Sequence, residues 1–377
     1  MKNKVFTFGI ALILGAVLCG CSTKPEVLTM KRGVNFSHWF SQTRLPDYPP
    51  VPATAEDIQL IRSLGLDHVR LPVDPVRIWE FPDEGPLNPE ALQEVDAAIE
   101  LALNHDLSVV VDMHPRPDLK EQLESDPATF QSFLKLWQEL ATHLAQYDTD
   151  RVALEILNEP MVENPEKWQS MANELHGIIR KAAPKHTLII GGAEWSDVAT
   201  LRRLVPVGDP NVIYTFHFYE PHLFTHQGAP WGSPEWLVLT NVPYPLPPEA
   251  GTNMLAGVTN EIAREALLDH IAQQWDADKI DSRISGAAEW AATHGVTIWC
   301  GEFGAYRPYA NPIDRARYVR DVRSTLERYG IGWTLWDYQG SFSLVEKEAP
   351  GAPAKVDWPM AEALGLSSIK STPLETD

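Results

Sequence analysis

Short apolar runs rich in β-branched residues alternate with amphipathic segments along most of the chain. Residues 109–111 (Val-Val-Val) and 188–190 (Leu-Ile-Ile) are apolar without alternation, which is typical of strands covered on both faces of a sheet. Strands that alternate with helices favour a parallel sheet. The pattern predicts eight strands, at residues 33–36, 68–71, 108–113, 153–157, 187–191, 212–216, 297–301 and 332–336.

Capping residues mark the helix boundaries between these strands. An asparagine that can cap a helix precedes a proline suited to the first helical position at Asn88, Asn164 and Asn311. A glycine precedes a strand, as at many helix C-termini, at Gly65, Gly295 and Gly330. We expect an α/β protein with one (β/α)8, or TIM, barrel domain over residues 31–377. An open doubly wound sheet would need a glycine-rich phosphate turn, which is not found in this sequence.

One interval between strands is much longer than the others. About 80 residues separate the sixth expected strand from the seventh, against roughly 30 for an average β/α unit. Residues 220–250 are rich in Pro, Trp and His, and residues 257–276 have helical periodicity. We expect an enlarged loop and an extra helix on the catalytic face, which in barrels of this type is the face at the C-terminal ends of the strands. Long structured loops there commonly shape substrate access.

The first 20 residues have the features of an export signal. Two lysines precede an apolar stretch, residues 5–18, that is shorter than an ordinary membrane span. The stretch ends Leu18-Cys19-Gly20-Cys21-Ser22, which resembles a bacterial lipobox. We expect a signal peptide at residues 1–20, lipid attachment to Cys21 and a tether at residues 21–30. Ser22, rather than Asp, after the cysteine favours sorting of the lipoprotein to the outer membrane of a bacterial envelope. The alternative is a plain secretory signal cut nearby.

Charge and cysteine content narrow the choice of partners. The formal net charge is −20 and becomes −22 without residues 1–20, which contain two lysines and no acidic residue. An acidic domain disfavours binding to nucleic acid or to a membrane surface by charge, so a lipid chain would provide the anchor. Cys300 lies inside an apolar run, which indicates a buried thiol and no disulfide. We expect a monomer.

Polar and aromatic side chains gather where the expected strands end. Glu159 in Asn158-Glu159-Pro160 and Glu302 in Gly301-Glu302-Phe303 each follow an apolar run. Barrels of this type keep their chemistry at the C-terminal strand ends, and two carboxylates across one cleft are the groups that cleave a glycosidic bond. Either glutamate alone is more often part of a structural salt bridge, so the pair carries the hypothesis. The other residues at expected strand ends are Arg70, His114, Asn158, His217, Tyr219 and Trp336.

These motifs, in this order, resemble glycoside hydrolase family 5 of clan A, the cellulase-type retaining glycosidases with a (β/α)8 barrel. The resemblance extends from Arg32-Gly33-Val34-Asn35 to Trp336-Asp337-Tyr338. It implies that Glu159 is the acid/base, that Glu302 is the nucleophile and that Asn158 binds the sugar 2-hydroxyl. It implies no cofactor and no metal.

The resemblance also implies roles for the surrounding side chains. Arg70 and Tyr219 would orient the nucleophile and keep it ionised, and Trp336 would be the stacking platform of the −1 subsite. His114 and His217 would line that subsite and tune the acid/base. Glu159 would need a raised pKa to hold a proton near neutral pH, and retention requires carboxyl groups roughly 5 Å apart.

The tryptophans divide into two expected groups. We expect helix residues Trp137, Trp168 and Trp290 to pack in the core. Flat apolar rings at the active face suit the C–H faces of pyranose rings, and Trp39, after the first strand, is our preferred second platform. The other tryptophans expected at this face are Trp79, Trp195, Trp231, Trp236 and Trp336.

The sequence favours an endo-β-1,4-glucanase that acts on a β-linked polysaccharide or oligosaccharide. The same residues would serve a β-mannanase, a xyloglucanase, an exo-β-1,3-glucanase or a glycosylceramide hydrolase. A different class, a non-catalytic glycan-binding surface lipoprotein, is disfavoured because both carboxylates are present. A metal-dependent hydrolase is disfavoured because His114 has Asp112 nearby but no further histidine at ligand spacing.

Overall fold

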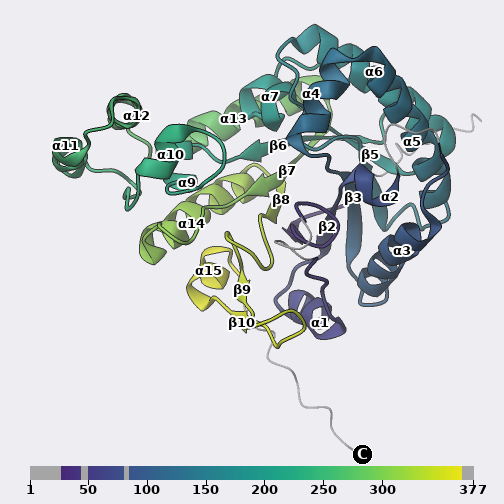
Figure 1. Ribbon diagram of the computed structural model, residues 1–377, viewed down its shortest axis with the longest axis horizontal. Helices are drawn as coiled ribbons and strands as arrows, with labels where there is room; N and C mark the ends of the chain where they lie inside the picture. Colours follow the sequence, from purple (N-terminus) through teal and green to yellow (C-terminus); the bar gives the residue numbers. More distant parts are fainter. Residues whose placement is uncertain (1–26, 44–49, 80–84, 367–377) are drawn as a thin grey trace, which may run out of the picture.

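A closed barrel of eight parallel strands forms the centre of the molecule, seen in a computed structural model that describes residues 27–43, 50–79 and 85–366 (Figure 1). The strands pair in chain order, and β8 closes the barrel by pairing with β1. This confirms the predicted fold class. The strands are β1 Arg32–Asn35, β2 His68–Val73, β3 Ser108–Met113, β4 Val152–Glu155, β5 Thr187–Gly191, β6 Val212–Phe218, β7 Thr297–Phe303 and β8 Gly332–Leu335.

All eight predicted strands are present, and their ends differ by at most two residues from those expected. Strands β2, β6 and β7 each continue two residues beyond the predicted end. His217 and Glu302 therefore lie within the last residues of strands, and Arg70 lies inside the barrel rather than at its rim. The export signal and Cys21 lie outside the described residues.

Helices surround the barrel, and their ends follow the predicted capping. Each of Asn88, Asn164 and Asn311 accepts backbone hydrogen bonds at a helix start, and Gly65 and Gly295 have left-handed φ angles of 88° and 64°. The helices are α1 Ala55–Ser63, α2 Pro75–Ile78, α3 Pro89–Leu103, α4 Pro117–Ser125, α5 Pro127–Leu144, α6 Pro165–Ala182, α7 Ala193–Ser196, α8 Val198–Leu201, α13 Ala277–His294, α14 Pro312–Arg328 and α15 Trp358–Ala363. A short hairpin, β9 Val345–Glu346 with β10 Lys355–Val356, follows β8.

The end of the predicted tether belongs to the barrel. Leu28 and Met30 are buried against side chains from the N-terminal halves of β3 to β7, including Ile189 and Trp299. The backbone N–H of Leu28 also donates to Thr187 Oγ1 at 3.0 Å. Residues 28–30 therefore close the floor of the barrel instead of forming a free linker, because their apolar side chains cover the open lower end.

The long interval after β6 forms a lobe of short helices, which we call the insertion. It projects from the side of the barrel (Figure 1) and has a hydrophobic cluster of its own, which includes Leu223, Val242 and Leu267. The sequence predicted one extra helix here, whereas the structure has four: α9 His222–Thr225, α10 Pro234–Val238, α11 Pro248–Gly257 and α12 Glu261–Gln273. Arg283 of α13 holds the start of the insertion by a bidentate ion pair with Glu220.

Candidate active site

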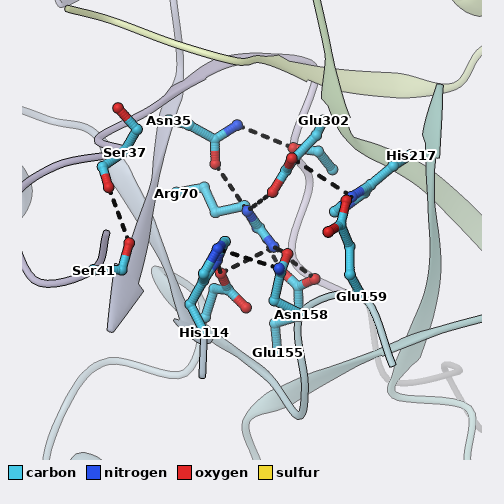
Figure 2. Close-up of polar contacts among 12 residues, drawn as sticks. Asn35, Ser37, Ser41, Arg70, His114, Glu155, Asn158, Glu159, His217 and Glu302 are labelled. Carbon is cyan, nitrogen blue, oxygen red and sulfur yellow. Dashed lines mark hydrogen bonds and ion pairs between the residues drawn. The ribbon is translucent and has the colours of Figure 1, made fainter. Parts of the chain in front are cut away.

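A buried guanidinium, that of Arg70, organises the floor of the site (Figure 2). Arg70 is fully buried and donates two hydrogen bonds to Glu155, at 2.7 and 3.0 Å. It donates others to Glu302 Oε1 at 2.6 Å and to Asn158 Oδ1 at 2.8 Å, and its Nη2 lies 3.0 Å from Asp112 Oδ2. A buried charge is tolerated when it is paired and hydrogen-bonded in this way. The planar fork of arginine lets one side chain fix groups from several strands.

Glu302 is held at both carboxylate oxygens. Arg70 binds Oε1, and the Tyr219 hydroxyl donates to Oε2 at 2.9 Å. Glu302 is only 4% exposed and lies on β7, so its position is fixed by the barrel strands themselves. These two contacts fix the orientation of the Glu302 carboxylate.

Glu159 lies near Glu302, but it is carried by the loop after β4 and not by a strand. It lies four residues beyond the end of β4, with a left-handed φ of 46° that is uncommon for a residue with a side chain. Its carboxylate is about a quarter exposed. Oε1 lies 2.9 Å from His217 Nδ1, and Oε2 lies 3.9 Å from Lys120 Nζ. Strained backbone of this kind concentrates at functional sites.

The electrostatics of Glu159 differ from those expected from the sequence. Burial would raise the pKa of Glu159, but the hydrogen bond and charge of His217, together with the charge of Lys120, lower this pKa to about 2. Burial lowers the pKa of His217, but the charges of Glu302 and Glu159 outweigh it and raise that pKa. Both shifts keep the shared proton on Nδ1 of His217. The shift of the Glu159 pKa is therefore opposite in direction to the raised pKa expected from the sequence.

His114 has a single defined protonation state. Arg70 donates to Asn158 Oδ1, so the Asn158 amide nitrogen is the group that donates to His114 Nε2 at 3.2 Å. His114 Nδ1 then carries the proton and donates to Asp112 Oδ2 at 2.7 Å. Burial and the charge of Lys120 lower the pKa of His114 to about 3, which keeps the ring neutral. Trp336 stacks on His114 with ring centroids 5.8 Å apart.

Oxygens of Glu159 and Glu302 and a nitrogen of His217 lie within 4.8 Å of one another, close enough to hold a metal ion. These atoms are already engaged, because Arg70 and Tyr219 bind the two oxygens of Glu302 and His217 binds Glu159. The arrangement fits a pair of catalytic carboxylates better than a metal centre. An oxygen of Glu159 therefore lies no more than 4.8 Å from an oxygen of Glu302, which is compatible with the separation of roughly 5 Å between the carboxyl groups of retaining glycosidases.

The predicted aromatic surface is only partly present. Trp39 is half-buried, stacks on Phe40 and meets Phe36 edge to face, outside the hydrogen-bonded set. Trp79 is 3% exposed and packs in the core, so its predicted use as a sugar-stacking surface is wrong. Trp195 is 53% exposed and donates its backbone N–H to Pro160 O, next to Glu159.

The remaining three tryptophans predicted at the active face differ in their exposure and ring contacts. Trp231 is 45% exposed, Trp236 stacks on His222 in the insertion, and Trp336 lies against His114. As predicted, the core encloses Trp137, Trp168 and Trp290.

Sequence reasoning assigned no role in this site to four of its polar residues: Asn35, Asp112, Glu155 and Lys120. Asn35 accepts from Arg70 and donates to the backbone of β7 and β8. Asp112 and Glu155 each interrupt an apolar strand, and this signal could have identified them, because a charge inside a buried strand needs a partner. Lys120 gives no such signal, since it lies on an amphipathic helix among other charged residues.

Comparisons with known proteins agree with this geometry. The sequence model of the family described as Cellulase (glycosyl hydrolase family 5) matches residues 29–341. Endoglucanase C of Acetivibrio thermocellus is 28% identical over 321 residues, which cover 83% of this chain and 92% of that protein. Endoglucanase 3 of Fibrobacter succinogenes is 26% identical over 357 residues, 90% of this chain and 53% of that protein, so this chain spans about half its length.

Solved structures give the same picture. Thermotoga maritima Cel5A in complex with cellobiose has a TM-score of 0.71 to this chain at 28% identity, with 89% of this chain and 97% of that chain covered. The same enzyme in complex with mannotriose also has a TM-score of 0.71, at 27% identity and equal coverage.

Proposed function

Because the chain belongs to the cellulase family, glycosyl hydrolase family 5, we propose that it is a retaining endo-β-1,4-glucanase in which Glu302 is the nucleophile and Glu159 the acid/base. The observation that carries this assignment is the difference in how the two carboxylates are held. Arg70 and Tyr219 each donate a hydrogen bond to one oxygen of Glu302, whereas Glu159 shares a proton with His217 across a hydrogen bond of 2.9 Å. One group is built for attack and the other for proton transfer.

The reaction would proceed by double displacement. Glu302 attacks the anomeric carbon and forms a glycosyl ester, while Glu159 gives its proton to the glycosidic oxygen as the bond to the leaving sugar breaks. A water molecule then gives a proton to Glu159 and attacks the same carbon, which releases the sugar with retained configuration and restores the Glu302 carboxylate.

The proton for the first step would come from the pair formed by His217 and Glu159. As Glu302 becomes an ester it loses the negative charge that helps to hold the proton on His217. Transfer from Nδ1 to Glu159 Oε1 then becomes more favourable at the moment when the leaving oxygen needs a proton.

Aromatic side chains near the two glutamates support a polysaccharide substrate. Trp336 stacks on His114 beside the nucleophile, and the exposed Trp195 is attached by its backbone to the residue after Glu159. Aromatic rings near the two glutamates would suit sugars that present flat C–H faces, as β-1,4-glucans do.

A panel of β-linked polysaccharides tests the substrate. We expect release of reducing ends from soluble cellulose derivatives and mixed-linkage glucan, with a rapid fall in viscosity that marks internal cleavage. Activity on mannan alone would assign a mannanase, the second candidate, which mannotriose binding by Cel5A favours. Activity on β-1,3-glucan without a fall in viscosity would assign an exo-enzyme. No hydrolysis of any glycan, combined with binding, would support the non-catalytic lipoprotein.

We also propose that the protein is lipid-anchored at the bacterial envelope through Cys21. The lipobox-like sequence before Cys21 supports this. Leu28 and Met30 are buried in the barrel floor. Six residue steps from Cys21 to residue 27 span at most roughly 20 Å, so the floor would lie close to the membrane and the catalytic mouth would face away. None of the helices in the described ranges is long and apolar enough to cross a membrane.

Fatty-acid labelling tests the anchor. The full-length protein expressed in a bacterium should incorporate labelled fatty acid and partition with membranes, and Cys21→Ser should abolish the label. Cys19→Ser is the matched control and should keep it. A wild-type protein that stays unlabelled and free of membranes would disprove the anchor without touching the enzymatic proposal.

A further inference from the structure

A lysine lies buried beside the acid/base, and neither the motifs nor the strand pattern predicts it. Lys120 belongs to α4, the helix that follows β3, and is 5% exposed between Leu119 and Leu123, which the same helix buries. Fully buried lysines are rare unless they are paired. The Lys120 ammonium lies 3.9 Å from Glu159 Oε2.

The position of Lys120 complements that of His217. His217 contacts Oε1 of Glu159 from β6, and Lys120 faces Oε2 from α4. Each oxygen of Glu159 therefore lies near a nitrogen of a different residue. In the same way, one oxygen of Glu302 binds Arg70 and the other binds Tyr219. A separation of 3.9 Å exceeds a hydrogen bond, so this contact acts through charge.

We propose that Lys120 is a positioning residue that holds the Glu159 carboxylate between two cationic groups, with His217 at one oxygen and Lys120 at the other. The proposal rests on the function proposed above, since it requires Glu159 to be the acid/base. A side chain from α4, outside the barrel strands, would thereby control the proton transfer at Glu159.

The charges around Glu159 determine the direction of the expected effect. Lys120, His217 and Arg70 are the basic groups that face this region, from α4, β6 and β2. The other titratable groups that face it are Glu302 of β7, Asp112 of β3, His114 after β3, Tyr219 after β6, and the more distant His222 and His226 of the insertion. Burial lowers the pKa of Lys120, and the charges of Glu159, Asp112 and Glu302 oppose this.

Removal of the Lys120 charge should raise the pKa of Glu159. The pair formed by Glu159 and His217 would then keep its proton to higher pH. The first step needs that proton, so the basic limb of the profile of kcat/KM against pH should move upward, by about one pH unit or more. A purely structural role would lower the rate or the stability without moving this limb.

Three variants test the proposal in the full-length enzyme. Lys120→Met removes the charge at similar length, Lys120→Arg keeps a charge, and Lys167→Met is the matched control. Lys167 is an exposed lysine of α6 that lies 3.7 Å from a carboxylate oxygen of Glu124, away from the site. The readout is kcat/KM against pH for an aryl cellobioside with a poor leaving group and for one with an activated leaving group.

We expect the basic limb to shift with Lys120→Met, to return toward the wild-type position with Lys120→Arg and to stay unchanged with Lys167→Met. The change in kcat/KM should be smaller for the activated substrate, which needs little protonation. An unshifted limb in folded Lys120→Met overturns the proposal, and if that variant does not fold, Lys120→Gln gives the same test. Should Glu159→Ala itself retain full activity on natural glycans, the proposed function fails instead, so the two failures are distinguishable.

Discussion

The two glutamates of the site are held in opposite ways. Glu302 lies on a barrel strand, is nearly buried and is bound at both oxygens within hydrogen-bond distance. Glu159 lies beyond the end of its strand, has a left-handed φ angle, is partly exposed and is held by a histidine and a more distant lysine. A nucleophile needs one fixed position and one charge state, whereas an acid/base must change its charge twice in each cycle.

Loss of the nucleophile should give the largest effect. Glu302→Gln keeps the shape of the side chain but cannot form the glycosyl ester, so kcat should fall by several orders of magnitude while the fold is kept. The measurement is the rate of reducing-end release together with a thermal unfolding curve. Glu174→Gln on the exposed face of α6 is the control. Retention of more than about a tenth of the activity by folded Glu302→Gln would remove this residue from the role.

Loss of the acid/base should depend on the leaving group. Glu159→Ala should lose roughly a hundredfold to ten-thousandfold in rate on natural glycans, and much less in the first step on activated aryl glycosides. Azide should rescue the second step. The product then distinguishes the mechanisms by proton NMR: a β-glycosyl azide fits retention, and an α-azide contradicts it.

Substitution of Arg70 tests how much the hydrogen bonds around Glu302 contribute to activity and stability. Arg70→Lys keeps the charge but loses the fork that joins Glu155, Asn158 and Glu302, so activity should fall about a hundredfold. The free energy of unfolding should fall by roughly 3 kcal/mol, because buried carboxylates lose hydrogen bonds.

Chemical denaturation measures the loss of stability in Arg70→Lys. The control is Arg203→Lys, whose exposed ion pair with Glu194 should contribute at most about 1 kcal/mol. Equal stability of the two variants would show that the network around Arg70 is not essential to the fold.

Trp39 should give the smallest effect. Trp39→Ala should weaken kcat/KM on soluble cellulose derivatives by roughly tenfold to a hundredfold, and should matter less for an aryl glycoside that occupies only the −1 subsite. Because Trp39 also packs on Phe36 and Phe40, a thermal unfolding curve must accompany the kinetics. An equal loss on both substrates would place Trp39 in the −1 subsite or in the core.

The sequence alone determined the barrel, because the signals for its elements are local. Unbroken apolar runs, asparagine caps and terminal glycines each depend on a few neighbouring residues, and all eight strands lie within two residues of their predicted ends. The same locality identified Glu159 and Glu302, which stand next to apolar runs. The insertion was recognised as an unusually long interval, but its four helices and separate core were not foreseen.

Only the tertiary structure decided how these residues act on one another. Arg70 and Glu302 are 232 positions apart and meet only because the barrel closes. The roles of Asp112 and Glu155, the burial of Trp79 and the approach of Lys120 to Glu159 depend on the same closure. The low pKa of Glu159 follows from these neighbours rather than from its own motif. Sequence patterns record which residues are buried, whereas electrostatics depends on distances between residues remote in sequence, and these are set only when the chain folds.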